Sequence, residues 1–225
     1  MLESDRAKLR TLTAMDGHRF TAYSAGDPKA QRGLVLLQEI FGLTAHMREV
    51  AEGFADAGYY AIAPALFDRV EPGIELAYAE TKRGMQVREQ ISDEASLLDV
   101  LAAGQALGTP YRGVLGYCWG GTLAWWSATR QSLFDVAVAW YGSGIAKTRN
   151  EVPKIPVQLH FGGNDRAIPL DDVEAIRSAR PEVEIYIYPG AGHCFGCHDR
   201  PEVYHAEATG LAQKRTLDFL NAHQR

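Results

Sequence analysis

Residues 114–126 have the sequence Val-Leu-Gly-Tyr-Cys-Trp-Gly-Gly-Thr-Leu-Ala-Trp-Trp. A strand-like run ends in Gly-x-Cys-x-Gly and passes directly into a helical pattern, which is typical of a nucleophile elbow. The central residue of so sharp a turn has strained backbone, and glycines at 116 and 120 leave room for the neighbouring chain. Cys118 would therefore lie at a helix N-terminus, where unpaired N–H groups favour a thiolate and can bind an oxyanion. The pattern predicts a cysteine nucleophile.

Length and composition indicate one globular domain over residues 1–225. The chain is 46% hydrophobic and 23% charged, which is enough apolar content for one large core. A net charge of -5, without any run of Lys or Arg, argues against a nucleic-acid partner. No apolar segment is long enough for a membrane span and no secretory signal is evident, so we expect a cytoplasmic protein without a membrane partner. The odd count of 3 cysteines indicates free thiols in a reducing compartment.

The periodicity of apolar residues predicts an α/β fold with a mostly parallel sheet covered by helices on both faces. The Asp-Gly turn at Asp16 and Gly17 predicts an N-terminal hairpin. Residues 66–85 are predicted to form a loop with a short helix. The predicted strands are 33–38, 59–63, 134–141, 157–161 and 183–188, and the predicted helices are 44–58, 87–107, 171–179 and 204–222.

Two further polar side chains follow predicted strands. Asp165 comes after Gly162-Gly163-Asn164, and His193 comes after Gly190-Ala191-Gly192. Because the carboxyl ends of parallel strands share one edge of a sheet, Cys118, Asp165 and His193 can meet there although they are far apart in sequence. The chain order of nucleophile, acid and base is that of α/β-hydrolases.

With these motifs in place, the whole chain resembles the dienelactone hydrolase family, whose members are carboxymethylenebutenolidase-like α/β-hydrolases. The resemblance is carried by residues 38–42 (Gln-Glu-Ile-Phe-Gly), 116–121, 162–165 and 190–193. It implies an α/β-hydrolase fold with no large cap domain. It also implies an esterase that hydrolyses a small ester, lactone or thioester without a cofactor or metal.

The resemblance implies roles for individual residues. Cys118 would be the nucleophile, His193 the general base and Asp165 the group that orients His193. The backbone N–H groups of Ile40 and Trp119 would form the oxyanion hole. Hydrolysis would pass through an acyl-thioester on Cys118.

The family also places a glutamate, here Glu39, beside the resting thiol and moves it when substrate binds. A negative charge at this position disfavours the thiolate. We therefore expect Glu39 to gate the nucleophile, keeping Cys118 protonated and less easily oxidised until substrate arrives.

The sequence departs from the well-known members of the family in one respect. They carry an arginine a few residues after the catalytic histidine and another before the elbow, which hold a substrate carboxylate, whereas Cys197 stands at the first of these positions here. Arg83, with Lys82 and Arg88 nearby, is a candidate for the second. The identity of the substrate is therefore open. An aromatic pocket suited to a neutral or aromatic ester is predicted from Phe41, Tyr117, Trp119, Trp140 and Phe195.

Three alternatives remain open at this stage. The same fold could serve as a non-catalytic or redox- and electrophile-sensing protein that uses Cys118, although a sensor needs neither Asp165 nor His193. The segment Cys194-Phe195-Gly196-Cys197-His198 matches a c-type haem attachment pattern and, with His193, offers four zinc ligands, but incidental active-site thiols are the default interpretation.

His160 lies inside a strand pattern and is predicted to be a core histidine. The oligomeric state is expected to be a monomer or a small homo-oligomer.

Overall fold

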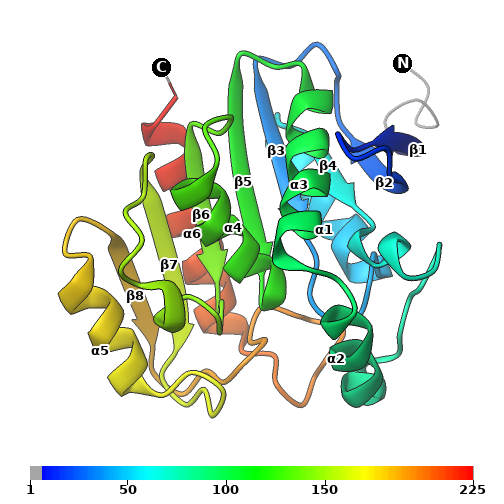
Figure 1. Cartoon of the computed structure of the whole chain (residues 1–225). Helices are drawn as coiled ribbons and strands as arrows, with labels where there is room; N and C mark the ends of the chain where they lie inside the picture. Colours follow the sequence, from blue (N-terminus) through cyan, green and yellow to red (C-terminus); the bar gives the residue numbers. More distant parts are fainter. Residues whose placement is uncertain (1–6, 225) are drawn as a thin grey trace. The chain divides into compact units, whose positions relative to one another are not determined.

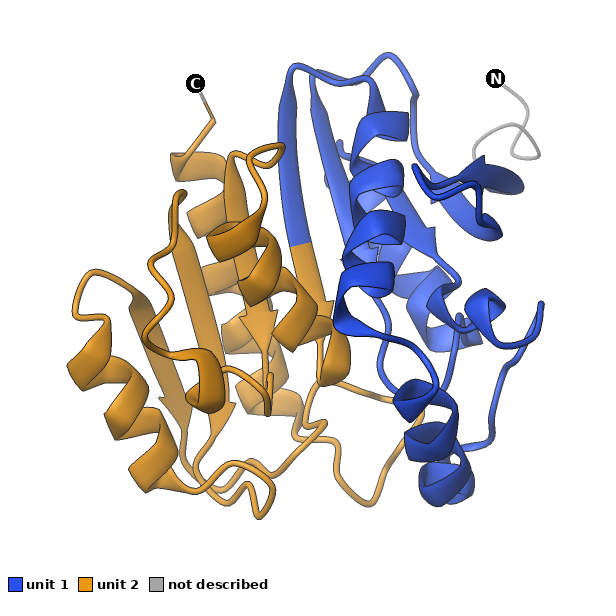
Figure 2. Cartoon of the chain, in the orientation of Figure 1, with its two compact units in different colours: residues 1–114 blue, residues 115–225 orange. Residues whose placement is uncertain are grey.

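The computed structural model describes residues 7–224, which contain an eight-stranded sheet with strand order β1-β2-β4-β3-β5-β6-β7-β8 (Figure 1). The first two strand pairs, β1–β2 and β2–β4, are antiparallel, whereas β3–β4, β6–β7 and β7–β8 are parallel. The predicted mostly parallel α/β-hydrolase sheet is therefore confirmed. The chain forms two compact units, residues 1–114 and 115–225, and the division falls inside β5 (Figure 2). A single domain over the whole chain stays a prediction, and the units are described in turn.

Unit 1 begins with the predicted hairpin. Strands β1 and β2 pair antiparallel with Leu9 opposite Tyr23, and Gly17 takes a φ of 86° in the turn between them. This is the left-handed conformation that glycine adopts without steric cost. The elements of unit 1 are β1 (Ala7–Thr13), β2 (Arg19–Ala25), β3 (Arg32–Leu37), α1 (Ala45–Asp56), β4 (Tyr60–Pro64), η2 (Leu66–Arg69), η3 (Tyr78–Glu80), α2 (Thr81–Glu89), α3 (Asp93–Leu107) and β5 (Tyr111–Tyr117).

The apolar runs of unit 1 form its interior strands, as predicted. All five residues of β4 and the last five of β3 are buried. A strand covered on both faces needs such a continuous apolar run. The helix after β3 also begins where the sequence indicated, because the Thr44 side chain accepts a hydrogen bond from the Met47 N–H (3.4 Å).

The prediction for residues 66–107 was wrong in part. One long helix was expected over 87–107, but the structure has α2 before residue 90 and α3 only from Asp93. Ser92 caps the second helix by accepting a hydrogen bond from the Ala95 N–H (3.1 Å), so a capping side chain interrupts the apolar periodicity. The predicted stop is confirmed, since Gly108 takes a φ of 64° directly after α3.

Unit 2 continues the sheet with three parallel strands. In Figure 1, α4 lies in front of these strands and α6 behind them. The side chains of α4 from Trp119 to Thr129 are all buried, so this helix is a core element. The elements of unit 2 are α4 (Trp119–Arg130), β6 (Val136–Trp140), η4 (Ala146–Thr148), β7 (Val157–Gly162), α5 (Leu170–Ala179), β8 (Glu184–Tyr188) and α6 (Ala206–Ala222).

Across residues 7–224, no helix combines the length and the apolar character that crossing a membrane requires.

A buried ion pair in unit 1 gives a test of the fold. Arg69 donates two hydrogen bonds to Asp99, from Nε to Oδ2 (2.8 Å) and from Nη2 to Oδ1 (2.7 Å), and the Asp99 side chain is 0% exposed. Asp99→Ala removes this partner and leaves Arg69 only its bond to the exposed Asp16 (2.8 Å), so we expect the free energy of unfolding to fall by about 1–3 kcal/mol in urea titrations. Asp218→Ala removes an exposed partner of Lys214 and serves as control, with an expected loss below about 0.5 kcal/mol. Equal losses in the two variants would contradict a structural role for the buried pair.

Candidate active site

The turn between β5 and α4 has the strained geometry that its sequence predicts. Cys118 has φ 54° and ψ -114° and occupies the N-cap position of α4. A Cβ atom on Gly116 would overlap the carbonyl group of Gly120, and one on Gly121 would lie 2.6 Å from the Trp140 carbonyl oxygen. Only glycine fits at both positions, so the chain can turn sharply enough to raise the cysteine at the end of the strand.

Backbone hydrogen bonds join this turn to the neighbouring strand ends. The Cys118 N–H donates to the carbonyl of Trp140 at the end of β6 (3.0 Å). After β7, the N–H groups of Gly163 and Asn164 donate to the carbonyls of Tyr188 and Ala191, each at 2.8 Å. The loops that follow β7 and β8 are therefore fastened together, which is why residues far apart in sequence come into contact.

The side chains of Cys118, His193 and Asp165 form one hydrogen-bonded chain at these strand ends. His193 Nδ1 lies 2.7 Å from Asp165 Oδ2, and His193 Nε2 lies 3.2 Å from Cys118 Sγ. The other oxygen of Asp165 accepts the N–H groups of Ala167 (2.8 Å) and Ile168 (3.2 Å), which fixes the carboxylate. The Asp165 side chain is 0% exposed and that of His193 is 25% exposed, so a small molecule can reach the imidazole but not the carboxylate.

The electrostatic interactions among Cys118, His193 and Asp165 favour a thiolate beside an imidazolium. Burial lowers the pKa of His193, but Asp165 and Cys118 outweigh this effect and raise it to about 10. Three neighbours lower the pKa of Cys118 well below its usual value: Cys194, whose hydrogen bond has the largest effect, His193 and the Trp119 N–H. Burial of the thiol acts in the opposite direction. Because the thiolate is the nucleophilic form, this environment activates Cys118.

The contact between Cys194 and Cys118 is a feature that sequence reasoning missed. Ligand atoms of Cys118, His193 and Cys194 all lie within 4.8 Å of one another. Two thiols and an imidazole are donors that Zn²⁺ accepts, so these three residues could ligate a soft metal ion. The zinc set considered from the sequence included Cys197, which is not part of this cluster. The only signal for Cys194 was its position directly after His193.

Glu39 and Ile40, to which the resemblance gives roles in the site, belong to unit 1 and follow shortly after the end of β3. Glu39 is 4% exposed, and Ile40 follows it before Phe41. In unit 2, the backbone N–H of Trp119 donates a hydrogen bond to Cys118. The gating role of Glu39 and the oxyanion-hole roles of Ile40 and Trp119 stay predictions.

The aromatic side chains named for the substrate pocket are largely buried. In unit 2, the ring of Trp140 lies 5.4 Å from that of Tyr117 and 5.4 Å from that of Phe195. Tyr141, which the sequence analysis did not single out, has its ring 5.3 Å from His193 and a φ of 40°. An aromatic ring thus packs beside His193.

The remaining two substrate-binding candidates belong to unit 1. Phe41 is 3% exposed and packs edge-on against Tyr78, with ring centres 5.0 Å apart. Arg83 donates to Glu80 (3.1 Å), and both side chains are largely exposed. Substrate contacts of these two residues stay predictions.

His160 is a core histidine, as predicted. It is 0% exposed and makes hydrogen bonds with the Tyr188 hydroxyl (2.7 Å) and with Gln158 Oε1 (2.8 Å). Burial, with a smaller contribution from the positive charge of Arg215, lowers its pKa to about 3. His160 is therefore neutral near pH 7, and its Nε2, which lies 3.1 Å from the Thr216 hydroxyl oxygen, joins β7 to α6.

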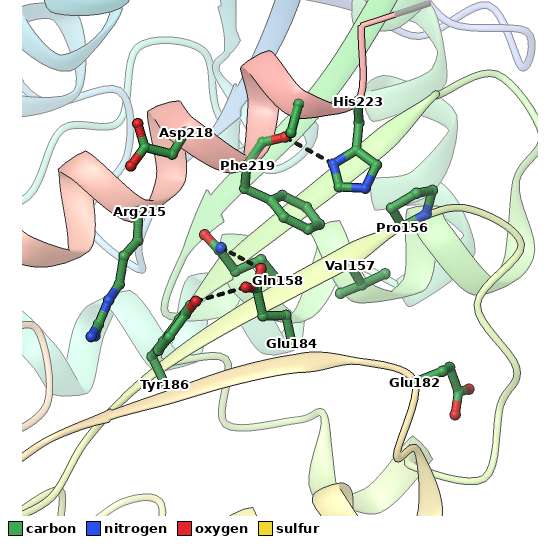
Figure 3. A pocket seen from close by; sticks show the side chains of 11 residues that line it. Pro156, Val157, Gln158, Glu182, Glu184, Tyr186, Arg215, Asp218, Phe219 and His223 are labelled. Atoms are coloured by element: carbon green, nitrogen blue, oxygen red, sulfur yellow. Dashed lines mark hydrogen bonds between the residues drawn. The ribbon is translucent and has the colours of Figure 1, made fainter.

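A cavity of about 470 Å³ in unit 2 (Figure 3) has neither Cys118 nor His193 among its lining residues. It is lined by Val157 and Glu184, the first residues of β7 and β8, and by residues of α6, whereas Asp165 and His193 follow the other ends of these strands. Glu184 accepts hydrogen bonds from Gln158 (2.7 Å) and Tyr186 (2.6 Å), so its carboxylate is already satisfied. The cavity contributes nothing to the site built on Cys118.

Comparison with known proteins identifies the family to which the chain is similar. The model of the family described as "Dienelactone hydrolase family" matches residues 20–224. The carboxymethylenebutenolidases of Pseudomonas putida and Pseudomonas knackmussii are each 35% identical over 224 residues, covering 93% of this chain and 94% of theirs.

Solved structures give the same fold. A proposed dienelactone hydrolase from Klebsiella pneumoniae superposes with a TM-score of 0.81 at 27% identity, covering 96% of this chain and 98% of that one. A dienelactone hydrolase-like promiscuous phosphotriesterase from metagenomic libraries has a TM-score of 0.78 at 19% identity, covering 97% and 99%. The second likeness concerns the fold alone.

The lowered pKa of Cys118 predicts its alkylation profile. An ordinary thiol with a pKa of about 8.5 reacts with iodoacetamide roughly 75-fold more slowly at pH 6 than at pH 8. We expect Cys118 to lose much less of its rate over this range, because its thiolate persists at lower pH. Mass spectrometry of the Cys118 peptide follows the reaction, and His193→Ala should move the midpoint upward. A wild-type rate that tracks a pKa near 8.5 would refute this activation.

Proposed function

This chain belongs to the dienelactone hydrolase family and is a hydrolase of ester or lactone bonds, and we propose that Cys118, His193 and Asp165 are its catalytic triad. The observation that carries the proposal is the continuous hydrogen-bonded chain from the Cys118 sulfur through His193 to the buried Asp165. The bond cleaved is that of a small ester, lactone or thioester.

In the first half of the reaction, the Cys118 thiolate attacks the substrate carbonyl carbon. Negative charge then develops on the carbonyl oxygen, and the N–H of Trp119 at the start of α4, with that of Ile40, donates to it. Each such donor contributes roughly 3–4 kcal/mol of transition-state stabilisation in comparable enzymes. His193 gives its proton to the leaving oxygen or sulfur, and an acyl-thioester on Cys118 remains.

In the second half, water hydrolyses this thioester. Neutral His193 takes a proton from the attacking water through Nε2, while its Nδ1–H stays on Asp165. Asp165 keeps this orientation because backbone N–H groups hold its second oxygen. Collapse of the tetrahedral intermediate releases the acid and returns the thiolate.

The preferred substrate is proposed to be neutral or aromatic. The family's arginine after the catalytic histidine is replaced by Cys197, which is 0% exposed and carries no charge for a substrate carboxylate. Arg83 is already paired with Glu80. The Tyr141 ring, 5.3 Å from that of His193, makes the surroundings of the imidazole more favourable to an apolar acyl group than to a carboxylate.

The nucleophile is tested with a substrate panel of p-nitrophenyl acetate, a dienelactone and an acyl thioester. Cys118→Ala should lower kcat/KM on the best substrate by at least about 1,000-fold, because no other group can form the acyl-enzyme. Cys197→Ser is the matched control, since it removes a buried thiol of unit 2 outside the hydrogen-bonded chain. If wild type and Cys118→Ala hydrolyse all three substrates at equal, near-background rates, the sensor alternative replaces this proposal.

The gating role of Glu39 is tested separately. If its carboxylate disfavours the Cys118 thiolate before substrate binds, in opposition to Cys194 and His193, Glu39→Gln removes this negative charge and raises the rate of Cys118 alkylation at pH 7. The measurement is the second-order rate constant with iodoacetamide for both proteins. An unchanged rate rules out the gate while leaving the triad proposal intact.

A further inference from the structure

No step of the proposed hydrolysis forms or breaks a bond at either cysteine of the Cys-x-x-Cys segment that follows His193. Cys194 and Cys197 flank Phe195 and Gly196, and they are 3% and 0% exposed. All three cysteines of the chain are reduced in the structure. Two buried thiols in the loop that carries the general base are an unusual concentration of oxidisable sulfur.

One of the two thiols lies against the nucleophile. The sulfur of Cys194 is within 4.8 Å of the sulfur of Cys118, in the same cluster as His193. A disulfide requires a sulfur separation of about 2.05 Å, so the two atoms need to approach by less than about 3 Å. A change of side-chain rotamer moves a sulfur atom by a distance of this order.

The loop backbone holds Cys194 in this position. Cys194 has a φ of 61°, which a non-glycine residue keeps only when its surroundings impose it. The Phe195 carbonyl accepts hydrogen bonds from the His205 N–H (3.0 Å) and the Thr209 hydroxyl (2.8 Å), and the Cys197 N–H donates to the Cys194 carbonyl (3.0 Å). The thiol is thus directed at Cys118 from a fixed loop.

We propose that Cys194 is a resolving thiol, so that oxidation of Cys118 by a hydroperoxide ends in a reversible Cys118–Cys194 disulfide. The formation of this bond is independent of hydrolysis, whereas its effect on activity rests on the proposed nucleophilic role of Cys118. The disulfide is a modification that turns the enzyme off and shields its nucleophile from irreversible oxidation.

The chemistry balances in two steps. The Cys118 thiolate attacks one oxygen of hydrogen peroxide, the O–O bond breaks, and with one proton the products are Cys118 sulfenic acid and water. The Cys194 sulfur then attacks Cys118 Sγ, the S–O bond breaks, and the departing hydroxide takes the Cys194 proton to form a second water. Two thiols are oxidised to one disulfide while peroxide is reduced, and an added dithiol reverses the change.

Peptide mapping of the whole wild-type protein tests the proposal directly. The protein is treated with a small excess of hydrogen peroxide, capped with N-ethylmaleimide, digested without reductant and analysed by mass spectrometry. We expect a loss of two hydrogen atoms from the intact chain and a cross-link between the Cys118 peptide and the peptide that contains Cys194. A disulfide confined to Cys194 and Cys197, or a Cys118 that goes to sulfinic acid without a cross-link, would overturn the proposal.

Two matched variants identify the resolving residue, because Cys194 and Cys197 share a tryptic peptide. Cys197→Ser should still form the cross-link, and dithiothreitol should restore most of its own starting activity after peroxide. Cys194→Ser keeps a hydroxyl beside Cys118 but cannot form the disulfide. Its Cys118 sulfenic acid should therefore react with dimedone when dimedone is present, and should be oxidised irreversibly to sulfinic acid when it is absent. The opposite pattern would assign resolution to Cys197 and refute the role of Cys194.

The cross-link and the hydrolytic assays fail independently. If no substrate is turned over, the peptide map still decides whether the disulfide forms. If hydrolysis requires Cys118 but peroxide yields no cross-link, the triad stands and only the resolving role of Cys194 is lost.

Discussion

Backbone hydrogen bonds between turns at successive strand ends hold the site of unit 2 together. The N–H of Cys118 is bonded to the end of β6, the Tyr141 N–H donates to the His160 carbonyl of β7 (2.8 Å), and Gly163 and Asn164 bond to the loop after β8. Each bond pairs a polar group that would otherwise be costly to bury. The positions of the thiol, imidazole and carboxylate therefore depend on backbone contacts rather than on flexible side chains.

Strain is concentrated at the same place. Among the described residues, the non-glycine positions with positive φ are Cys118, Tyr141 and Cys194. Such conformations cost of order 1–3 kcal/mol each and persist only where surrounding structure imposes them. Burial of α4 and of the Trp140, Phe195 and Tyr188 rings offsets this cost. Cys118, the aromatic rings around Trp140 and the Cys194 thiol are thus held close together.

Much of the fold could be predicted from local patterns, and the errors have identifiable physical causes. Buried strands and the cap at Thr44 left clear signals because each depends on the residue types themselves. The break between α2 and α3 was missed because an apolar stripe continues across Ser92, and only the capping bond to Ala95 shows that a new helix begins. The contacts of Tyr141 with His193 and of Cys194 with Cys118 were missed because positive φ at a non-glycine residue, which directs these side chains, has no sequence signature.

The sequence by itself determined the reactive turn, the order of cysteine, aspartate and histidine along the chain, and the parallel sheet that brings strand ends to one edge. These follow from glycine clearance, apolar periodicity and connectivity, all of which are local or topological properties. Tertiary structure alone decided that Asp165 and His193 make hydrogen bonds and that Cys194, rather than Cys197, contacts Cys118. Distances between side chains on different loops depend on strand register, loop bonding and rotamers, which are set only when the core packs.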